Sequence, residues 1–461
     1  MIFDLKRLEL NVSYDQAILP APAGICEKYM KQRSYKIVTF GCQMNLADSG
    51  VLGAILDSRG YLKAETEAEA DIIILNTCSV REKAEMRVLG RLAELSHFKE
   101  STDKKIVVVG CMAQRMGDQL SARAPYVDII LGTDRIFDLP RYLENGTAFP
   151  AVNTATGLER MADVIPSRDS RYAAFVTISR GCDNFCTYCI VPYVRGRERS
   201  YPVSHILKQV RALVDDGVLE VTLLGQNVNS YRDGENDFPS LLKTVVSESA
   251  LKRIRFMTSH PKDMSDRLIE TIGSEHKMMA HVHLPLQSGA NRILRKMGRV
   301  YTIEHYMSLV DKLRKAVPDI SLTTDLIVGF PSETDAEYRM TLEAVRTIGF
   351  DSAFMFRYSV REGTKAAGLQ DDVPEEEKID RLNGLINLQK NVAFEKNQEE
   401  VGRIRSVLID GHSRRSEKVL KGKTEGNKTV LFDGDPGLIG TIRQVRIKSA
   451  DSWTLHGELT E

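Results

Sequence analysis

The sequence predicts an α/β protein in three parts: an N-terminal parallel α/β sheet domain, a central partial barrel of six β/α units, and a small all-β barrel at the C-terminus. Two observations lead to this prediction. Short β-branched runs alternate with amphipathic stretches up to about residue 358, and the chain after residue 400 consists of alternating strands separated by Asp-Gly and Pro-Gly turns. Near-continuous apolar runs between helices are typical of buried parallel strands.

Composition sets the outer limits. The 461 residues contain 63 Lys+Arg and 63 Asp+Glu, and 42% are hydrophobic. At roughly 100–200 residues per domain, about two to four domains are expected. The balanced charge argues against a protein that coats nucleic acid, although a local basic face remains possible. No apolar run approaches the ~18–20 residues of a membrane span, and the start of the chain lacks the apolar core of an export signal. We therefore expect a cytoplasmic protein without membrane contact.

The N-terminal part begins with residues 1–33, which lack periodicity and are expected to form a loose arm. The α/β sheet domain follows over residues 34–150. Its predicted strands are 35–40, 71–75, 105–109 and 127–131. A stretch rich in Thr, Ser and Pro predicts a linker over residues 147–170.

The central part spans residues 168–398. Its predicted strands are 173–179, 220–224, 253–257, 281–285, 321–328 and 352–358, and helical stretches separate them. Six β/α units suggest a closed or partly closed parallel barrel, whose chemistry is expected at the carboxyl ends of the strands. A long charged helix is predicted over residues 374–400.

The last part, residues 400–461, is predicted to be a small β-barrel. Its residues 401–461 carry 11 Lys+Arg against 8 Asp+Glu. Five of the cations are expected between strands, and they are Arg414, Arg415, Lys418, Lys421 and Lys423. A basic face on such a barrel suits RNA binding, and a solvated charge run is the alternative.

The seven cysteines stand at positions 26, 42, 78, 111, 182, 186 and 189. An odd number without an export signal indicates reduced thiols. Cys42, Cys78 and Cys111 each follow a predicted strand. Because the carboxyl ends of parallel strands share one edge of a sheet, we expect these three thiols to meet in a metal site. Burial as small core residues is the alternative, and Cys26 is expected to be inert.

The strongest local motif is CxxxCxxC, formed by Cys182, Cys186 and Cys189 directly after the first barrel strand. Three thiolates on one loop can hold three corners of a 4Fe–4S cluster and leave the fourth iron open to a small molecule. Zinc is the alternative, but structural zinc sites usually have four protein ligands.

This motif at the first strand of a six-unit barrel resembles the radical S-adenosylmethionine (SAM) superfamily. With the three-cysteine domain before it and the small barrel after it, the chain resembles the methylthiotransferases over roughly residues 34–461. The motifs that carry this likeness are GCQMN at 41–45, NTCSVREKA at 76–84 and VPYVRGRE at 191–198. The tail motifs at 407–411 and 422–424 resemble a TRAM domain, a small RNA-binding barrel.

The resemblance implies a transferase that methylthiolates C2 of N6-isopentenyladenosine at position 37 of the tRNA anticodon loop. It implies two 4Fe–4S clusters: an auxiliary one on Cys42, Cys78 and Cys111, and one on the CxxxCxxC cysteines that binds SAM. It also implies two SAM molecules per turnover, the tRNA anticodon arm as partner, an electron donor such as flavodoxin or ferredoxin, a sulfur source, and a monomer. Two alternatives stay open: another acceptor, either threonylcarbamoyl-adenosine in tRNA or a ribosomal protein, and a non-catalytic iron–sulfur protein that binds RNA or carries electrons.

The resemblance also suggests which residues contact SAM and RNA. Side chains in the loop of the CxxxCxxC motif at 182–189, called the cluster loop below, and at strand ends are expected to bind SAM, or else to cap helices and turns. They are Tyr188, Gln226, Asn227, Gln287, Ser288 and Asp325. Five arginines are expected to meet RNA phosphates, with a solvated basic loop as the alternative. They are Arg195, Arg197, Arg199, Arg414 and Arg415. His281 and His283 are expected to pack rather than to bind metal.

Overall fold

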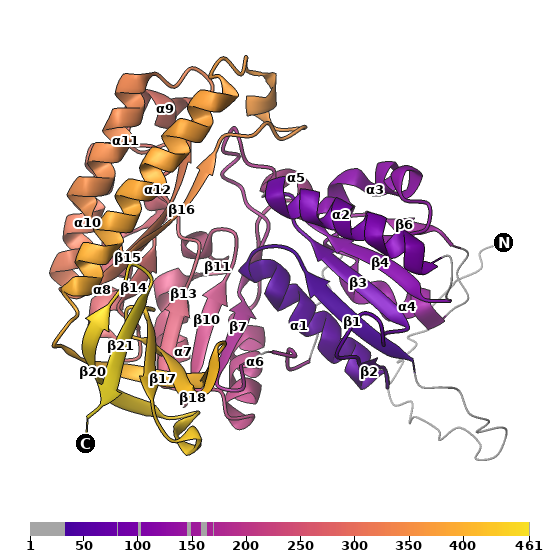
Figure 1. The fold of residues 1–461 in the computed structure, drawn as a ribbon, viewed down its shortest axis with the longest axis horizontal. Helices are drawn as coiled ribbons and strands as arrows, with labels where there is room; N and C mark the ends of the chain where they lie inside the picture. Colours follow the sequence, from indigo (N-terminus) through magenta and orange to yellow (C-terminus); the bar gives the residue numbers. More distant parts are fainter. Residues whose placement is uncertain are drawn as a thin grey trace, which may run out of the picture.

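The structure is a computed structural model that describes residues 33–80, 82–99, 103–144, 149–157, 164–168 and 170–460. The predicted arm, except for residue 33, and Cys26 within it lie outside the described residues. Figure 1 shows three bodies: a sheet domain in indigo and purple, a barrel from magenta to orange, and a small yellow barrel at the C-terminus. Among the described residues, no helix has the length and apolar character that crossing a membrane requires.

The N-terminal domain is a six-stranded sheet in the order β2-β1-β3-β4-β5-β6, and every neighbouring pair is parallel. Its strands are β1 (Ser34–Thr39), β2 (Leu62–Lys63), β3 (Ile72–Thr77), β4 (Lys105–Gly110), β5 (Ile129–Leu131) and β6 (Ala151–Asn153). Its helices are α1 (Gln43–Ser58), α2 (Glu82–Lys99), α3 (Cys111–Arg123), η1 (Ile136–Asp138) and α4 (Leu139–Glu144). All four predicted strands are confirmed. The strand β6 lies inside the predicted linker, so the sheet continues beyond residue 150.

The sheet is buried on both faces because successive side chains of a strand point to opposite sides. On β3, Ile73 and Leu75 pack in one apolar cluster with Val88 of α2. The alternate residues Ile72 and Ile74 pack in a second cluster, which contains Leu52 of α1. This explains the unbroken apolar run in the sequence: no face of the strand meets water.

The central barrel consists of two three-stranded parallel sheets, β13-β10-β7 and β14-β15-β16, with a parallel bridge between Ile254 and Met278. Its strands are β7 (Ala173–Thr177), β10 (Glu220–Leu224), β13 (Arg253–Phe256), β14 (His281–His283), β15 (Ser321–Val328) and β16 (Ser352–Arg357). All six lie at the predicted positions. The predicted partial barrel is therefore confirmed, with β7 and β16 as its outer strands.

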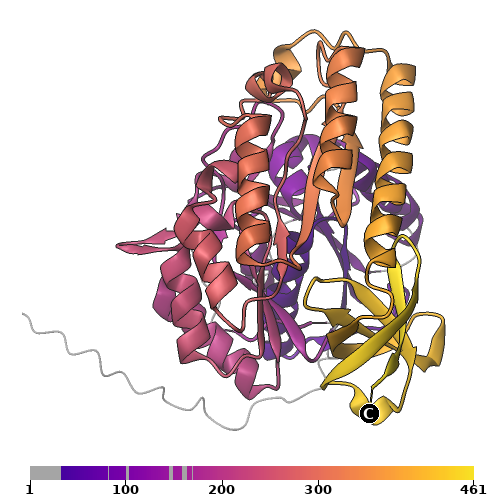
Figure 2. The same cartoon turned by 90° about the vertical axis from the view of Figure 1, so that its left-hand side faces the viewer.

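Helices cover the outside of this barrel, as Figure 2 shows. They are α6 (Val203–Asp215), α7 (Phe238–Glu248), α8 (Asp266–Ser274), α9 (Asn291–Lys296), α10 (Ile303–Ala316), α11 (Asp335–Ile348) and α12 (Glu375–Gln398). The short helix α5 (Val191–Arg195) instead lies against α3 of the sheet domain. Short pieces complete the barrel: β8 (Ser179–Arg180), β9 (Arg199–Ser200), β11 (Arg232–Asp233), β12 (Asn236–Asp237), η2 (Val228–Ser230), η3 (Pro261–Asp263) and η4 (Lys365–Gly368).

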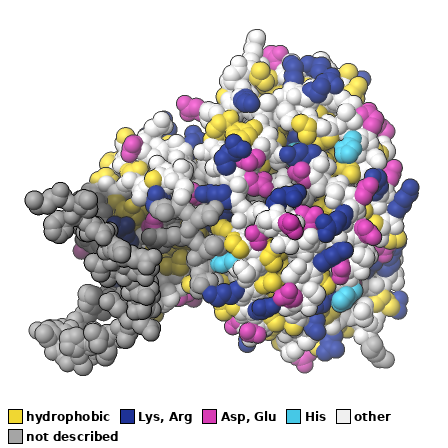
Figure 3. Space-filling model, turned by 180° about the vertical axis from the view of Figure 1, so that it is seen from behind, with side chains coloured by type: hydrophobic (Ala, Val, Ile, Leu, Met, Phe, Trp, Pro, Cys, Tyr) yellow, Lys and Arg dark blue, Asp and Glu magenta, His cyan; other side chains and the backbone are white. Residues whose placement is uncertain are grey.

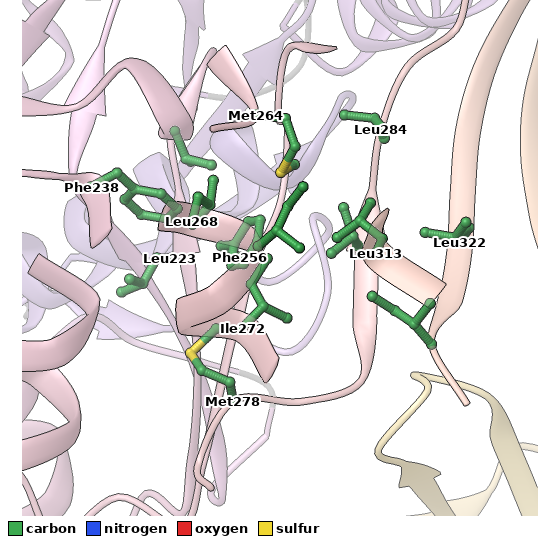
Figure 4. Close-up of a cluster of buried hydrophobic side chains, with 14 of the residues drawn as sticks. Leu223, Phe238, Phe256, Met264, Leu268, Ile272, Met278, Leu284, Leu313 and Leu322 are labelled. Carbon is green, nitrogen blue, oxygen red and sulfur yellow. The ribbon is translucent and has the colours of Figure 1, made fainter. Parts of the chain in front are cut away.

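The barrel core lies between strands and helices. Figure 4 shows Phe256 of β13 beside Phe238 of α7, with Leu268 and Ile272 of α8 next to them. The two phenyl rings meet edge to face, with centroids 5.2 Å apart. Burying a side chain of this size contributes about 1.5–3 kcal/mol. Such contacts hold the strand ends, and thus the loops after them, in place.

The C-terminal domain is a closed barrel in the order β17-β18-β19-β21-β20. Its elements are β17 (Ile404–Ser413), β18 (Ser416–Thr424), β19 (Thr429–Asp433), η5 (Pro436–Leu438), β20 (Ile442–Ala450) and β21 (Thr454–Leu459). The prediction that the five cations lie between strands is wrong for the three lysines, which belong to β18. Only Arg414 and Arg415 occupy the turn between β17 and β18.

The small barrel docks at the amino ends of the central strands. Arg253, at the start of β13, donates to the carbonyls of Lys423 and Ser406, each at 2.8 Å. Lys428 pairs with Asp351, just before β16, at 2.8 Å. The C-terminal barrel therefore lies at the end of the central barrel opposite to the carboxyl ends of its strands (Figure 1).

Candidate functional site

Three cysteines meet at the carboxyl edge of the N-terminal sheet. Cys42 follows β1 and precedes α1, Cys78 follows β3, and Cys111 begins α3 directly after β4. The strands β1, β3 and β4 are neighbours, so their ends deliver the three thiols to one place. Gly110 makes the tight turn into Cys111 at φ +96°, where a Cβ would lie 2.6 Å from the Thr77 carbonyl oxygen.

The thiols of this trio interact electrically. Cys42 accepts a hydrogen bond from Cys78, and this bond lowers the pKa of Cys42 to about 6. The positive charge of Arg195 acts in the same direction, whereas burial opposes both. The same bond and burial raise the pKa of Cys78. Burial also raises the pKa of Cys111, although Arg195 acts in the opposite direction. A thiolate is the form that binds metal, and Cys42 is closest to that form.

Arg195 lies inside this site and not on the surface. Its Nε donates to Sγ of Cys111 at 3.3 Å, and its Nη2 donates to the Asp48 carboxylate at 3.0 Å. The residue is 4% exposed. Contact with an RNA phosphate, expected from the sequence, is therefore corrected: the guanidinium is enclosed by the N-terminal domain.

The second trio occupies the loop after β8. Cys182 and Cys186 are buried, and Cys189 is half-buried. Burial, followed by the neighbouring Cys186, raises the pKa of Cys189 to about 12. Burial also raises the pKa of Cys182, again with Cys186 contributing. Cys186 is thus close enough to Cys182 and to Cys189 to act on the pKa of both, which places the three sulfur atoms in one neighbourhood.

The spacing of the thiols distinguishes a single metal ion from an iron–sulfur cluster. In the part of the chain that the structure describes, no three His, Cys, Asp or Glu side chains are grouped tightly enough for a single metal ion. A 4Fe–4S cluster holds its thiolates farther apart than one ion does, because each thiolate binds a different iron. Three neighbouring thiols in each trio fit such a cluster.

The two trios lie on the same side of the molecule. Cys111 packs against Ile190 and Val194, and Ile190 directly follows Cys189. Thr133 of the N-terminal domain donates to the Val194 carbonyl at 2.7 Å. The carboxyl edge of the sheet domain therefore faces the cluster loop of the barrel.

The N-terminal domain also spans the open side of the barrel. Its helix α1 contacts β7, one outer strand. Beyond the other outer strand, Arg361 reaches Glu85 of α2 at 3.3 Å and donates to the Val80 carbonyl at 3.2 Å. Figure 1 shows the sheet domain beside the barrel. The sheet domain thus contacts the barrel next to both of its outer strands.

Two of the residues expected to contact SAM lie next to the cluster loop with free polar atoms. Gln226 accepts through Oε1 from the Gly181 backbone N–H, and its Nε2 is buried without a partner among the described residues. Asn227 donates to Asp263 at 2.7 Å, and its Oδ1 likewise has no partner there. Buried polar atoms without partners are costly, so a ligand that pairs with them is favoured.

The other four expected SAM residues have varied surroundings. Gln287 is buried and adopts a left-handed φ of +74° beside Leu326. Ser288 is fully buried, and its hydroxyl accepts from the Ala290 N–H at 3.2 Å, as a turn cap does. Asp325 keeps 30% of its side chain exposed, 3.5 Å from His283. Tyr188 packs against an apolar cluster, and burial raises its pKa.

The remaining arginines differ in exposure. The Arg197 side chain is 73% exposed and pairs with Asp183 at 2.6 Å. Arg199 is mostly buried and pairs with Asp134 at 3.0 Å. Arg414 and Arg415 are exposed. Figure 3 shows the back of the molecule, where cationic and anionic side chains are interspersed.

His281 and His283 are buried and bond to Thr323, so the expected packing role is confirmed.

Sequence reasoning missed three residues of the site, namely Asp48, Arg180 and Arg299. Asp48 is 1% exposed and pairs with Arg180, two positions before Cys182, as well as with Arg195. Arg299 is buried, its Nε has no partner among the described residues, and its charge opposes the effect of burial on the pKa of Cys189. A carboxylate within the apolar stretch of α1 is a signal that could have indicated Asp48; nothing local marks Arg299.

Comparisons with known proteins match all three parts. The family models are "Uncharacterized protein family UPF0004" at residues 34–132, "Radical SAM superfamily" at 176–345 and "TRAM domain" at 398–460. A tRNA-2-methylthio-N(6)-dimethylallyladenosine synthase of Moorella thermoacetica is 47% identical, covering 93% of this chain and 99% of that one. The synthase of Parabacteroides distasonis is 46% identical and covers 93% and 96%.

Solved structures share the fold at low identity. The cobalamin-dependent SAM radical enzyme OxsB has a TM-score of 0.51 at 15% identity, over 78% of this chain and 56% of that one. The radical SAM methyltransferase TsrM from Kitasatospora setae also has a TM-score of 0.51, at 14% identity over 73% and 77%. On the strength of the relatives with more than 45% identity over nearly the whole chain, this protein belongs to the family of tRNA-2-methylthio-N(6)-dimethylallyladenosine synthases within the radical SAM superfamily.

Proposed function

We propose that this chain is a transferase that adds a methylthio group to C2 of N6-isopentenyladenosine in the anticodon loop of tRNA. One observation carries the proposal: two three-cysteine sites face each other across a domain boundary, and Cys111 of one contacts the helix that follows the other. The names of the relatives support the choice of substrate. A reaction that joins a radical source, a base and a sulfur atom needs such closeness, because the reacting atoms must approach within about 3–3.5 Å.

Each trio would hold a 4Fe–4S cluster with one iron free of protein ligands. When bound, the cluster at Cys182, Cys186 and Cys189 supplies a radical from one SAM, and the auxiliary cluster supplies sulfur that a second SAM methylates. The chain's own part is to orient the reacting groups and to exclude water from them. The contacts between the sheet domain and the barrel would serve the second task, since a radical site must stay dry.

SAM would lie beside the cluster loop. The unpartnered Nε2 of Gln226 and Oδ1 of Asn227 support this, because they can donate to and accept from a polar ligand. Tyr188, Gln287 and Asp325 complete the proposed contacts. Ser288 would act indirectly by holding the turn after Gln287.

RNA contact would fall on exposed cations, namely Arg197 near the cluster loop and Arg414 and Arg415 on the small barrel. The target base must leave its stack, which costs about a few kcal/mol and less in a loop than in a duplex. The proposed partners are the anticodon arm of tRNA, a small electron carrier such as flavodoxin or ferredoxin, and a sulfur source. The proposed enzyme works as a monomer in the cytoplasm, where tRNA is found.

Anaerobic reconstitution tests the two-cluster proposal. About eight irons per chain are expected, together with reductant-dependent cleavage of SAM to 5′-deoxyadenosine. Changing Cys182, Cys186 and Cys189 to Ala should abolish that cleavage. The same change at Cys42, Cys78 and Cys111 should spare cleavage and eliminate the methylthio product. Cleavage that survives the first triple change would refute the radical role.

Mass spectrometry of nucleosides from total tRNA tests the substrate. Loss of 2-methylthio-N6-isopentenyladenosine in cells without the gene is expected. Loss of a methylthio group from threonylcarbamoyl-adenosine or from a ribosomal protein would instead identify the other acceptors. A chain that binds RNA and iron but never yields 5′-deoxyadenosine would be a non-catalytic iron–sulfur protein.

A further inference from the structure

Arg195 links the two proposed cluster sites through a short helix. The helix α5, Val191–Arg195, begins two residues after Cys189. Its residue Val194 packs against Cys111. Arg195 at its end is thereby carried into the N-terminal domain, where its Nε donates to the Cys111 sulfur at 3.3 Å.

The guanidinium is anchored on its other side by Asp48. Its Nη2 donates to Oδ2 of this carboxylate at 3.0 Å, and the second carboxylate oxygen accepts from Arg180. Within the described chain, Nη1 of Arg195 is buried without a hydrogen-bond partner. The side chain thus has a fixed position, and the two N–H bonds of Nη1 are left to donate.

The charges of this network do not cancel. Two buried guanidinium groups, Arg180 and Arg195, share the single carboxylate of Asp48. Asp48 alone therefore leaves one positive charge for the groups at the three thiols to balance, because burying an unbalanced charge is costly. An anionic group at the three thiols would balance it. Hydrogen bonds and positive charge next to an iron–sulfur cluster also favour its reduced state, which carries one more negative charge.

We propose that Arg195 is the positioning and charge-balancing residue of the auxiliary cluster: Asp48 holds it so that its charge and its N–H groups act on the cluster bound by Cys42, Cys78 and Cys111. This inference rests on the proposed function, because it assumes that cluster. It assigns to Arg195 control of the cluster's reduction potential. A residue that only held the domains together would have no such effect.

A redox titration of the reconstituted full-length chain, followed by electron paramagnetic resonance, tests this role. Added SAM identifies the signal of the cluster at Cys182, Cys186 and Cys189. The change Arg195→Gln should shift the midpoint potential of the other cluster to more negative values and reduce methylthio product about 10- to 100-fold. Arg195→Lys keeps the charge and should keep the potential near that of the unchanged protein. Arg211→Gln, a surface change on α6, should alter neither potential.

A second variant should shift the midpoint potential of the same cluster in the opposite direction. Asp48→Asn removes the negative charge beside Arg195, so the midpoint potential should move to more positive values. General damage would not produce opposite shifts in the two variants. The proposal fails if Arg195→Gln with full iron leaves the auxiliary potential unchanged, if Arg195→Lys shifts it as far as Arg195→Gln, or if Asp48→Asn shifts it in the negative direction. Four irons instead of eight in the unchanged protein would refute the proposed function itself.

Discussion

Arg253 at the start of β13 donates through Nη2 to the Ser406 carbonyl of β17 at 2.8 Å, and this bond joins the central barrel to the small C-terminal barrel. The side chain is 2% exposed, and its Nη1 donates to a second carbonyl, that of Lys423. A charged group is thus used to satisfy backbone oxygens of another domain, which fixes the small barrel at one end of the larger one.

Replacing this arginine should loosen the junction. In Arg253→Met, two half-buried carbonyls lose a charged donor, so the free energy of unfolding should fall by roughly 2–4 kcal/mol. Chemical denaturation measures the loss, and limited proteolysis between α12 and β17 locates it. Arg443→Met, at an exposed position of β20, is the control. Equal stability of the two variants would show that the bonds to Ser406 and Lys423 add nothing.

Removing Asp48 should destabilise the contact between the N-terminal domain and the barrel. In Asp48→Ala, Arg180 and Arg195 stay buried without their carboxylate, and breaking a buried pair costs roughly 3–5 kcal/mol. The free energy of unfolding of the iron-free chain measures this. Asp216→Ala breaks an ion pair with Arg168 at an exposed carboxylate and should change little. A small effect of Asp48→Ala would mean that water reaches the two arginines.

Exposed arginines of the β17–β18 turn should contribute to tRNA binding through phosphate contacts. The double change Arg414→Glu and Arg415→Glu should weaken binding and lower the salt dependence, the slope of log K against log salt, by about 2. Fluorescence anisotropy with labelled tRNA at several salt concentrations measures both. The control is Arg339→Glu, at an exposed cation of α11 that pairs with Asp335 one turn earlier. An unchanged slope would assign the turn a role other than phosphate contact.

His260 should make stability depend on pH. Burial, with the charges of Arg299 and Lys262, lowers its pKa to about 2, so the folded chain keeps it neutral while the unfolded chain protonates it near its ordinary value of 6.5. The contribution of His260 to the free energy of unfolding is therefore fully present above pH 6.5 and is lost as the pH falls below this value. Between pH 7 and 5.5 the loss is about 1 kcal/mol.

The variant His260→Asn checks this sign. Asparagine can accept the bond that His260 Nδ1 takes from the Lys262 N–H at 3.2 Å, but it does not titrate. Denaturation midpoints of the iron-free chain at pH 7 and 5.5 should differ less in the variant than in the unchanged protein. The same difference in both would show that His260 is protonated in the folded chain.

The sheets could be predicted from local patterns. All six central strands and four strands of the N-terminal sheet are apolar runs long enough to identify. The rule that parallel strands end at one edge of a sheet predicted that Cys42, Cys78 and Cys111 meet. The strand β18 was missed because Leu420 is its one large buried side chain, with Gly422 and Thr424 at the other buried positions. Its pairing with β17 and β19, and not its own composition, makes it a strand.

The role of Arg195 could not be predicted from the sequence for a different reason. Three arginines alternate at positions 195, 197 and 199, and they read as one basic loop. The five-residue helix α5 turns the first inward to Asp48, while Arg197 stays in solvent. This inward orientation depends on the Asp48 carboxylate, which is 147 residues away along the chain. The local sequence pattern contains no information about such a partner.

Each thiol of the first trio is set directly behind a buried strand, and this makes the arrangement sensitive to chain length. Inserting one residue within β3 would reverse which side chains face α1 and α2 and would turn Cys78 away from its neighbours. The altered chain would still possess every cysteine. A gene can therefore keep the codons for all three cysteines and still encode a protein in which their thiols do not meet.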